Sequence, residues 1–97
     1  MEAEQDYDYE AILHRYHEHY SQRAKQAIVG SVEQKTYEAI ARLLARKTTE
    51  TPKQRAFHLV LTLMTFAQSA SQVEARAIYR QCCLDLNRDT GQEPLSL

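Results

Sequence analysis

Glycine and proline are almost missing from this sequence. Only two of each occur in 97 residues, and Gly91 and Pro94 lie close to the C-terminus. Because tight β-hairpins depend on these residues for their turns, little of the chain is suited to an antiparallel sheet. The common residues are Ala, Leu, Glu, Gln and Arg, which all favour helices. The sequence therefore predicts an all-α protein.

Capping signals divide the chain into four predicted helices. Ser31 and Thr51 are each followed three residues later by Gln, which is the spacing of a capping box. Ser71 with Glu74 repeats the pattern. No Gly or Pro separates the third and fourth helices, so the sequence leaves open whether they are separate or one bent helix. The predicted helices span roughly residues 7–29, 32–47, 52–70 and 72–88.

The third predicted helix is the most apolar of the four. Apolar residues cover about 220° of its circumference when it is projected at the helical period. The remaining stripe carries no carboxylate, Lys or Arg and consists of Gln54, His58, Thr62, Thr65 and Ser69. A helix of this kind lies at the centre of a bundle or in a subunit interface. We therefore expect a compact four-helix bundle with residues 52–70 at its centre.

Surplus apolar residues also predict a homodimer. The fourth helix has an apolar stripe that suits the core and a second apolar patch on its opposite side. One small core cannot bury both. Each large apolar side chain left in water forgoes roughly 1.5–3 kcal/mol. A two-fold interface is the commonest way to bury such residues. The predicted dimer interface consists of His58, Thr62, Thr65, Val73, Ala77 and Leu84.

A basic group surrounds the junction between the second and third helices. Arg42 and Arg46 lie one helical turn apart and repel each other mildly in an isolated helix. A partner that carries carboxylates or phosphates would relieve this repulsion, and Arg suits forked contacts with both groups. The simpler interpretation is a solvated face in which Glu38 partners Arg42. The group consists of Arg42, Arg46, Lys47, Lys53 and Arg55, with Glu50 as the local counter-charge.

Two further features suggest chemistry. Glu10, His14 and His17 are spaced so that their side chains converge on one flank of the first helix, and these residue types suit zinc or iron. No second helix supplies the matching carboxylate and histidine, so a solvated flank is favoured. Cys82 and Cys83 point about 100° apart on a helix. We expect Cys82 in the core and Cys83 nearer the surface.

Composition narrows the classes of function. The formal net charge of −1 gives no general attraction to nucleic acid or to an anionic membrane. No apolar run approaches the ~20 residues that span a bilayer, and the acidic N-terminus differs from the basic start of a signal peptide. Phosphate-binding loops, nucleophile elbows and zinc-protease motifs do not occur. We expect a cytoplasmic protein that has no cofactor and no membrane contact.

The sequence thus favours a non-enzymatic module that binds another protein. We expect one helical domain over residues 6–88, with a flexible acidic segment at 1–5 and a flexible tail at 89–97. Helix faces would serve an adaptor, or a modulator or inhibitor of a larger protein machine. The alternative is a nucleic-acid-associated protein whose basic junction contacts phosphates. A metal-dependent enzyme is a third hypothesis, and it depends on the first helix alone.

Overall fold

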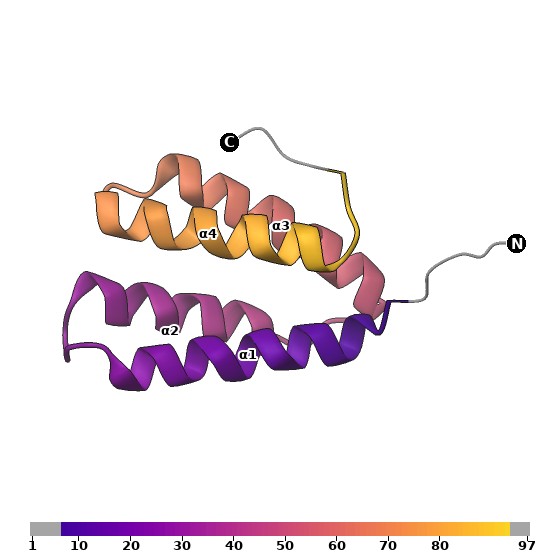
Figure 1. The fold of residues 1–97 in the computed structure, drawn as a ribbon, viewed down its shortest axis with the longest axis horizontal. Helices are drawn as coiled ribbons and strands as arrows, with labels where there is room; N and C mark the ends of the chain where they lie inside the picture. Colours follow the sequence, from indigo (N-terminus) through magenta and orange to yellow (C-terminus); the bar gives the residue numbers. More distant parts are fainter. Residues whose placement is uncertain (1–6, 94–97) are drawn as a thin grey trace, which may run out of the picture.

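The described part of the chain folds into four helices, α1 (Tyr9–Gln26), α2 (Val32–Ala45), α3 (Pro52–Ser69) and α4 (Val73–Asp89). The computed structural model describes residues 7–93, and this part of the chain contains no β-strand. Consecutive helices run antiparallel, and the closest pairs are α1 with α2 and α3 with α4 (Figure 1). Two helical hairpins therefore pack on each other. The predicted all-α bundle of four helices is confirmed.

Side-chain caps begin α2 and α3 where the sequence predicts them. The Thr51 hydroxyl accepts a hydrogen bond of 3.2 Å from the Gln54 backbone, and the Gln54 side chain accepts one of 3.0 Å from the Thr51 backbone. The Ser31 hydroxyl accepts from the Gln34 backbone at 3.0 Å. These bonds satisfy backbone N–H groups that have no partner inside the helix. Both starts depend on local sequence alone, so they could be predicted.

The third and fourth helices are separate. Ala70 has an extended backbone with ψ of 140°, which ends α3. The predicted cap at Ser71 is wrong, because Gln72 occupies the capping position and makes no side-chain cap bond. The Arg76 guanidinium instead donates to the Ala70 carbonyl at 3.2 Å. A long side chain from the next helix thus supplies the hydrogen bond at this break.

The core lies between the two hairpins. Its largest fully buried side chains come from three helices and are Ile40, Val60, Leu63, Cys82, Cys83 and Leu86. The expectation that Cys83 lies near the surface is wrong: its thiol donates to the Val60 carbonyl at 3.3 Å. Burial raises the pKa of Cys82 to about 12 and also raises the pKa of Cys83. Both thiols are therefore core groups with low reactivity.

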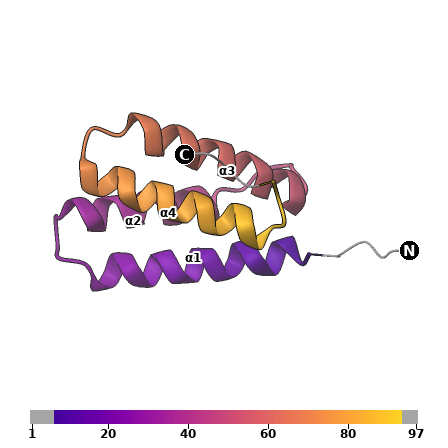
Figure 2. The same ribbon diagram turned by 45° about the horizontal axis from the view of Figure 1, so that its top comes forward.

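The expected central position of α3 is not observed. This helix packs along α4 and, over fewer residues, against α1, and it lies at an edge of the bundle in Figure 2. Phe57 is 51% exposed and Leu61 is 42% exposed. In a bundle of two hairpins every helix keeps an outer face, so two neighbours cannot cover an apolar arc as wide as that of α3.

The C-terminal part of the domain is packed against the bundle. The Thr90 side chain is buried, and its hydroxyl donates to the Leu86 carbonyl at 2.7 Å. Gly91 has φ of +70°, and the Tyr7 ring lies where a side chain at that position would be. The predicted boundary at residue 88 falls inside α4. The expected flexible segment at 1–5 and the last residues, 94–97, lie outside the described range.

Candidate functional site

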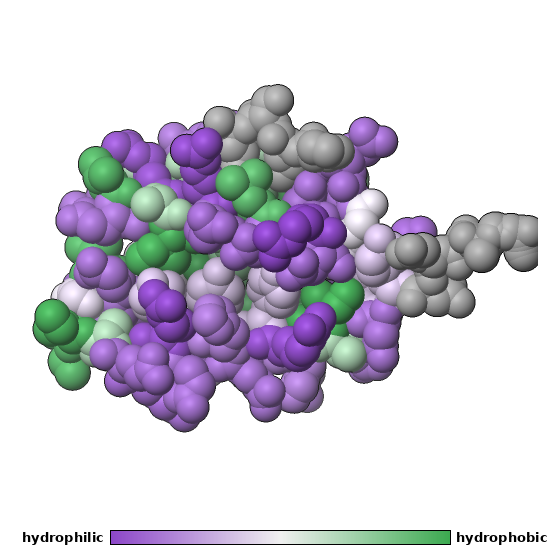
Figure 3. Space-filling view, in the orientation of Figure 1, coloured by the Kyte–Doolittle hydropathy of each residue, from purple (hydrophilic) through white to green (hydrophobic). Residues whose placement is uncertain are grey.

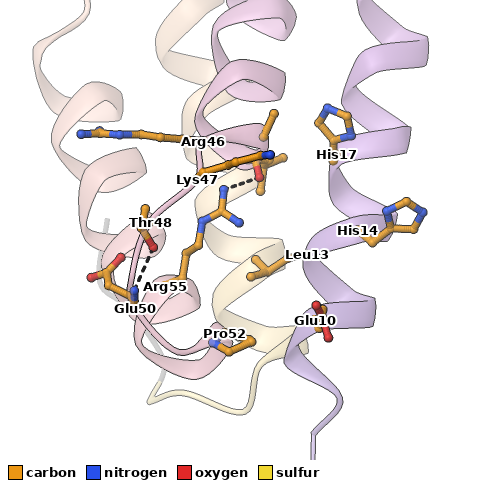
Figure 4. A pocket seen from close by; sticks show the side chains of 12 residues that line it. Glu10, Leu13, His14, His17, Arg46, Lys47, Thr48, Glu50, Pro52 and Arg55 are labelled. Atoms are coloured by element: carbon orange, nitrogen blue, oxygen red, sulfur yellow. Dashed lines mark hydrogen bonds between the residues drawn. The ribbon is translucent and has the colours of Figure 1, made fainter.

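A cleft opens at the junction of α2 and α3, where α1 passes beside it (Figure 4). Its volume is about 650 Å³. Leu13 and Leu44 close the floor, since both are buried side chains of the core. The polar lining consists of Glu10, His14, His17, Arg46, Lys47, Thr48, Glu50 and Arg55. The cleft thus joins part of the predicted basic group to the predicted histidine flank.

Arg55 is fixed at the wall of this cleft. Its Nη2 donates to the backbone carbonyl of Leu43 at 3.1 Å and also to that of Leu44. These carbonyls lie in the last turn of α2, where a cation interacts favourably with the helix dipole. Arg55 therefore caps α2 from the following helix. Its position is set by the backbone, and the side chain is half-buried.

The exposed cations of the cleft have a different arrangement. Lys47 extends over the cleft toward α1, whereas Arg46 extends to the opposite side (Figure 4). Within residues 7–93, neither side chain makes an ion pair or a hydrogen bond. Because Arg55 already satisfies the end of α2, Lys47 and Arg46 have no structural role in capping it.

Two carboxylates limit the positive charge. Glu50 contacts the His58 imidazole through its Oε2 and is directed away from Arg55 (Figure 4). Glu10 lines the cleft from the first turn of α1. Counting Arg46, Lys47 and Arg55 against Glu10 and Glu50, the lining carries a small positive excess when its histidines are neutral. The cleft is therefore weakly cationic rather than strongly so.

The predicted basic group is divided by the fold. Arg46, Lys47 and Arg55 line the cleft, whereas Arg42 and Lys53 are exposed and lie outside it. A continuous basic patch without carboxylates would have supported contacts with nucleic acid. The observed surface is interrupted by carboxylates, and its best-placed guanidinium is held by backbone carbonyls. These observations give the nucleic-acid alternative no support.

The predicted histidine flank of α1 lies along the cleft, but its three side chains do not converge on one point. Glu10, His14 and His17 all line the cleft. Across the described range, 7–93, no group of three or more His, Cys, Asp or Glu side chains is placed to hold a metal ion. His14 lies 3.4 Å from Glu18 and forms an i, i+4 pair along α1. Sequence reasoning missed that this flank faces the basic junction, because only tertiary packing brings them together.

A second candidate surface is the outer face of α3. Its exposed residues share one side of the helix through spacings of three and four. We define the α3 outer face as Gln54, Phe57, His58, Leu61, Thr65 and Gln68. No charged residue occurs between Arg55 and Glu74. The sequence analysis assigned Phe57 and Leu61 to the buried arc of this helix. In the structure both are exposed and form the apolar part of the α3 outer face.

The residues of the predicted dimer interface lie on two adjacent helices. His58 and Thr65 belong to the α3 outer face, and Thr62 is half-buried at its edge. On α4, Val73 and Ala77 are exposed, and Leu84 is half-buried on the same side. Figure 3 shows apolar residues on the surface over α4. The packing of α3 against α4 therefore places all six predicted residues on one helical hairpin.

The turn between α1 and α2 presents two more exposed aliphatic residues. Ile28 is 81% exposed and Val29 is 87% exposed, at the end of the molecule marked by the α1–α2 turn (Figures 1 and 3). The prediction extended the first helix to residue 29, but α1 ends at Gln26 and Ala27 is already extended. Gly30, with φ of +80°, completes the turn. The two residues therefore project from a turn.

Comparisons with known proteins add no assignment to these surfaces. Among residues 7–93, none of the helices has the length and apolar character required to cross a membrane. No protein-family model, curated protein or solved structure matches this chain.

Proposed function

We propose that this protein is a non-enzymatic binding module that self-associates through the α3 outer face and acts as an adaptor or modulator of a larger protein assembly. The observation that carries the proposal is an exposed helix face made of residues without formal charge, where Phe57 and Leu61 are about half exposed and the Glu50 carboxylate contacts the face at His58, near its N-terminal end. Charged residues normally make up a quarter or more of a soluble surface. A face without them is suited to burial.

Two hydroxyls near the C-terminal end of α3, one on the outer face and one beside it, favour burial as well. The Thr65 hydroxyl donates to the Leu61 carbonyl at 3.1 Å, and the Ser69 hydroxyl donates to the Thr65 carbonyl at 2.8 Å. These hydroxyls already have partners in their own helix. Removing them from water therefore costs less than burying unsatisfied polar groups.

A second copy of this chain is the partner that the face fits best. In a two-fold interface each side chain near the axis meets its own copy, so any charge there meets a like charge. The uncharged stretch of α3 avoids that repulsion. Burying apolar side chains contributes roughly 1.5–3 kcal/mol for each one moved fully from water. Val73 and Ala77 on α4 would extend the contact along the same hairpin.

The state of the cysteines and of His58 supports a role without catalysis and a cytoplasmic location. Among the described residues both thiols are buried, and the one histidine outside α1 is engaged by Glu50. Neither cysteine has the low pKa that a nucleophile needs. Unpaired thiols are typical of a reducing compartment.

Two matched variants test where the proposed dimer forms. Leu61→Lys places a charge on the α3 outer face, and Val29→Lys places the same charge at a more exposed apolar position on the α1–α2 turn, which serves as the control. We expect Leu61→Lys to give a monomer by light scattering and Val29→Lys to remain dimeric. Dissociation by Val29→Lys, with Leu61→Lys unaffected, would place the interface at the turn and refute the proposal.

A further inference from the structure

The cleft at the α2–α3 junction holds a cation whose position is fixed before any ligand arrives. An Arg side chain has five N–H donors, and the two on Nη2 of Arg55 donate to the carbonyls of Leu43 and Leu44. The other donors of Arg55 have no partner among residues 7–93. Such a guanidinium is already held in place by some of its N–H groups, while the others are available to a ligand. It therefore loses little conformational entropy when it binds a carboxylate.

Lys47 adds a second charge above the same space. Its side chain extends across the cleft toward α1 (Figure 4) and has no carboxylate partner in the described part of the chain. His17 reaches the cleft from α1 on the facing side. Donors from two sides of one cleft are therefore available to a single anionic group.

The rest of the lining indicates what carries that anion. The floor is formed by Leu13 and Leu44, with Ala45 and Pro52 exposed at the walls. An aliphatic group can pack against these residues. Glu10 and Glu50 also line the cleft, and their charge repels a ligand that is anionic along its whole length. The lining therefore fits a ligand with a localised carboxylate and an adjoining apolar group.

We propose that this cleft binds an acidic peptide segment, with a carboxylate side chain on Lys47 and Arg55 and a neighbouring aliphatic side chain against Leu13 and Leu44. The cleft is a second binding site, separate from the α3 outer face, and the proposal does not depend on self-association. An adaptor with both features would hold a partner segment on each copy of the chain. Duplex nucleic acid is the less suitable occupant, because the two carboxylates of the cleft would oppose its phosphates.

The test uses a short fluorescein-labelled peptide of glutamate, leucine and glycine, and a control peptide in which glutamine replaces each glutamate. Binding is followed by fluorescence anisotropy at ~50 mM salt, where screening is weak. We expect the acidic peptide to bind at least tenfold more tightly than its control, since charge-assisted hydrogen bonds are the stronger ones. Equal binding of the two peptides would overturn the proposal.

Matched variants locate the site. Lys47→Gln and Lys53→Gln remove the same charge from the same junction, but only Lys47 lines the cleft. We expect Lys47→Gln to weaken binding about tenfold and Lys53→Gln to weaken it less than twofold. Glu10→Gln should strengthen binding, because it removes a repelling carboxylate. Equal losses from the two lysine variants would show diffuse charge attraction and no cleft site.

Three further measurements separate the alternatives. The monomeric variant Leu61→Lys should bind the acidic peptide as wild type does. A protein that fails to bind the peptide and a protein that fails to dimerise therefore give different results.

Deletion of residues 1–6, which carry three carboxylates, should leave peptide binding unchanged. Tighter binding after deletion would show that the chain's own N-terminus competes for the cleft. An oligonucleotide that binds more tightly than the peptide and depends on Lys47 would overturn the peptide assignment.

Discussion

The Tyr16 hydroxyl donates a hydrogen bond of 2.5 Å to Oδ2 of Asp89, a residue 73 positions further along the chain. This bond ties the middle of α1 to the last turn of α4. Burial and the adjacent carboxylate raise the pKa of Tyr16, so the phenol keeps its proton and remains a donor above the ordinary pKa of a tyrosine. Hydrogen bonds from Arg88 and Tyr16 lower the pKa of the Asp89 carboxyl.

Removing the phenol should destabilise the fold. We expect Tyr16→Phe to reduce the free energy of unfolding by about 1.5–3 kcal/mol, the usual contribution of a hydrogen bond to a charged group. Tyr9→Phe is the control, because the Tyr9 hydroxyl has no hydrogen bond among residues 7–93. Urea titration of both variants measures the difference. Equal losses would mean that the bond contributes nothing specific.

The lowered pKa of Asp89 makes stability depend on pH. The folded protein binds this proton more weakly than the unfolded chain does, so the stabilisation is complete above the pKa of the unfolded chain. It is lost as the pH falls through the lower pKa of the folded state. We expect the melting temperature of Asp89→Asn to fall less than that of wild type between about pH 5 and pH 2. A parallel fall in both proteins would exclude Asp89 as a contributor.

Thr51 and Ser71 have the same capping-box spacing in the sequence, but only Thr51 caps a helix in the structure. Replacing each of them by Ala should therefore have different effects on stability. Thr51→Ala removes a hydroxyl that accepts the Gln54 N–H, and we expect it to cost about 1 kcal/mol. Ser71→Ala removes a hydroxyl from a position that caps no helix in the structure, and it should be nearly neutral. Thermal melts of the two variants suffice, and a larger loss from Ser71→Ala would contradict the observed start of α4.

Local signals account for the part of the fold that the sequence could predict. The caps at Ser31 and Thr51 and the apolar stripes of the helices need only neighbouring residues, so the helical fold and the starts of α2 and α3 follow from them. The break between α3 and α4 does not, because no side-chain cap marks the start of α4. The burial of Cys83 could not be predicted in this way. Its thiol lies against the Val60 carbonyl, so its environment is set by how α4 packs on α3.

The candidate sites show the same division. The sequence identified Lys47 and Arg55 as cations of one junction, and it identified His17 as part of a separate flank. Their common cleft exists because α1 passes beside the α2–α3 junction. The sequence shows that apolar residues cover a wide arc of α3, but it does not show which part of that arc the neighbouring helices bury. Phe57 remains exposed because the bundle supplies α3 with neighbours on its inner side only.

Self-association through α3 is tested most directly by the mass of the wild-type protein at micromolar concentration. The chain has a mass of 11.2 kDa. Sedimentation equilibrium should give twice that value and a dependence on concentration that fits a reversible dimer. A single species of 11.2 kDa at every micromolar concentration measured would contradict the proposal and leave the α3 outer face as a surface for a different protein.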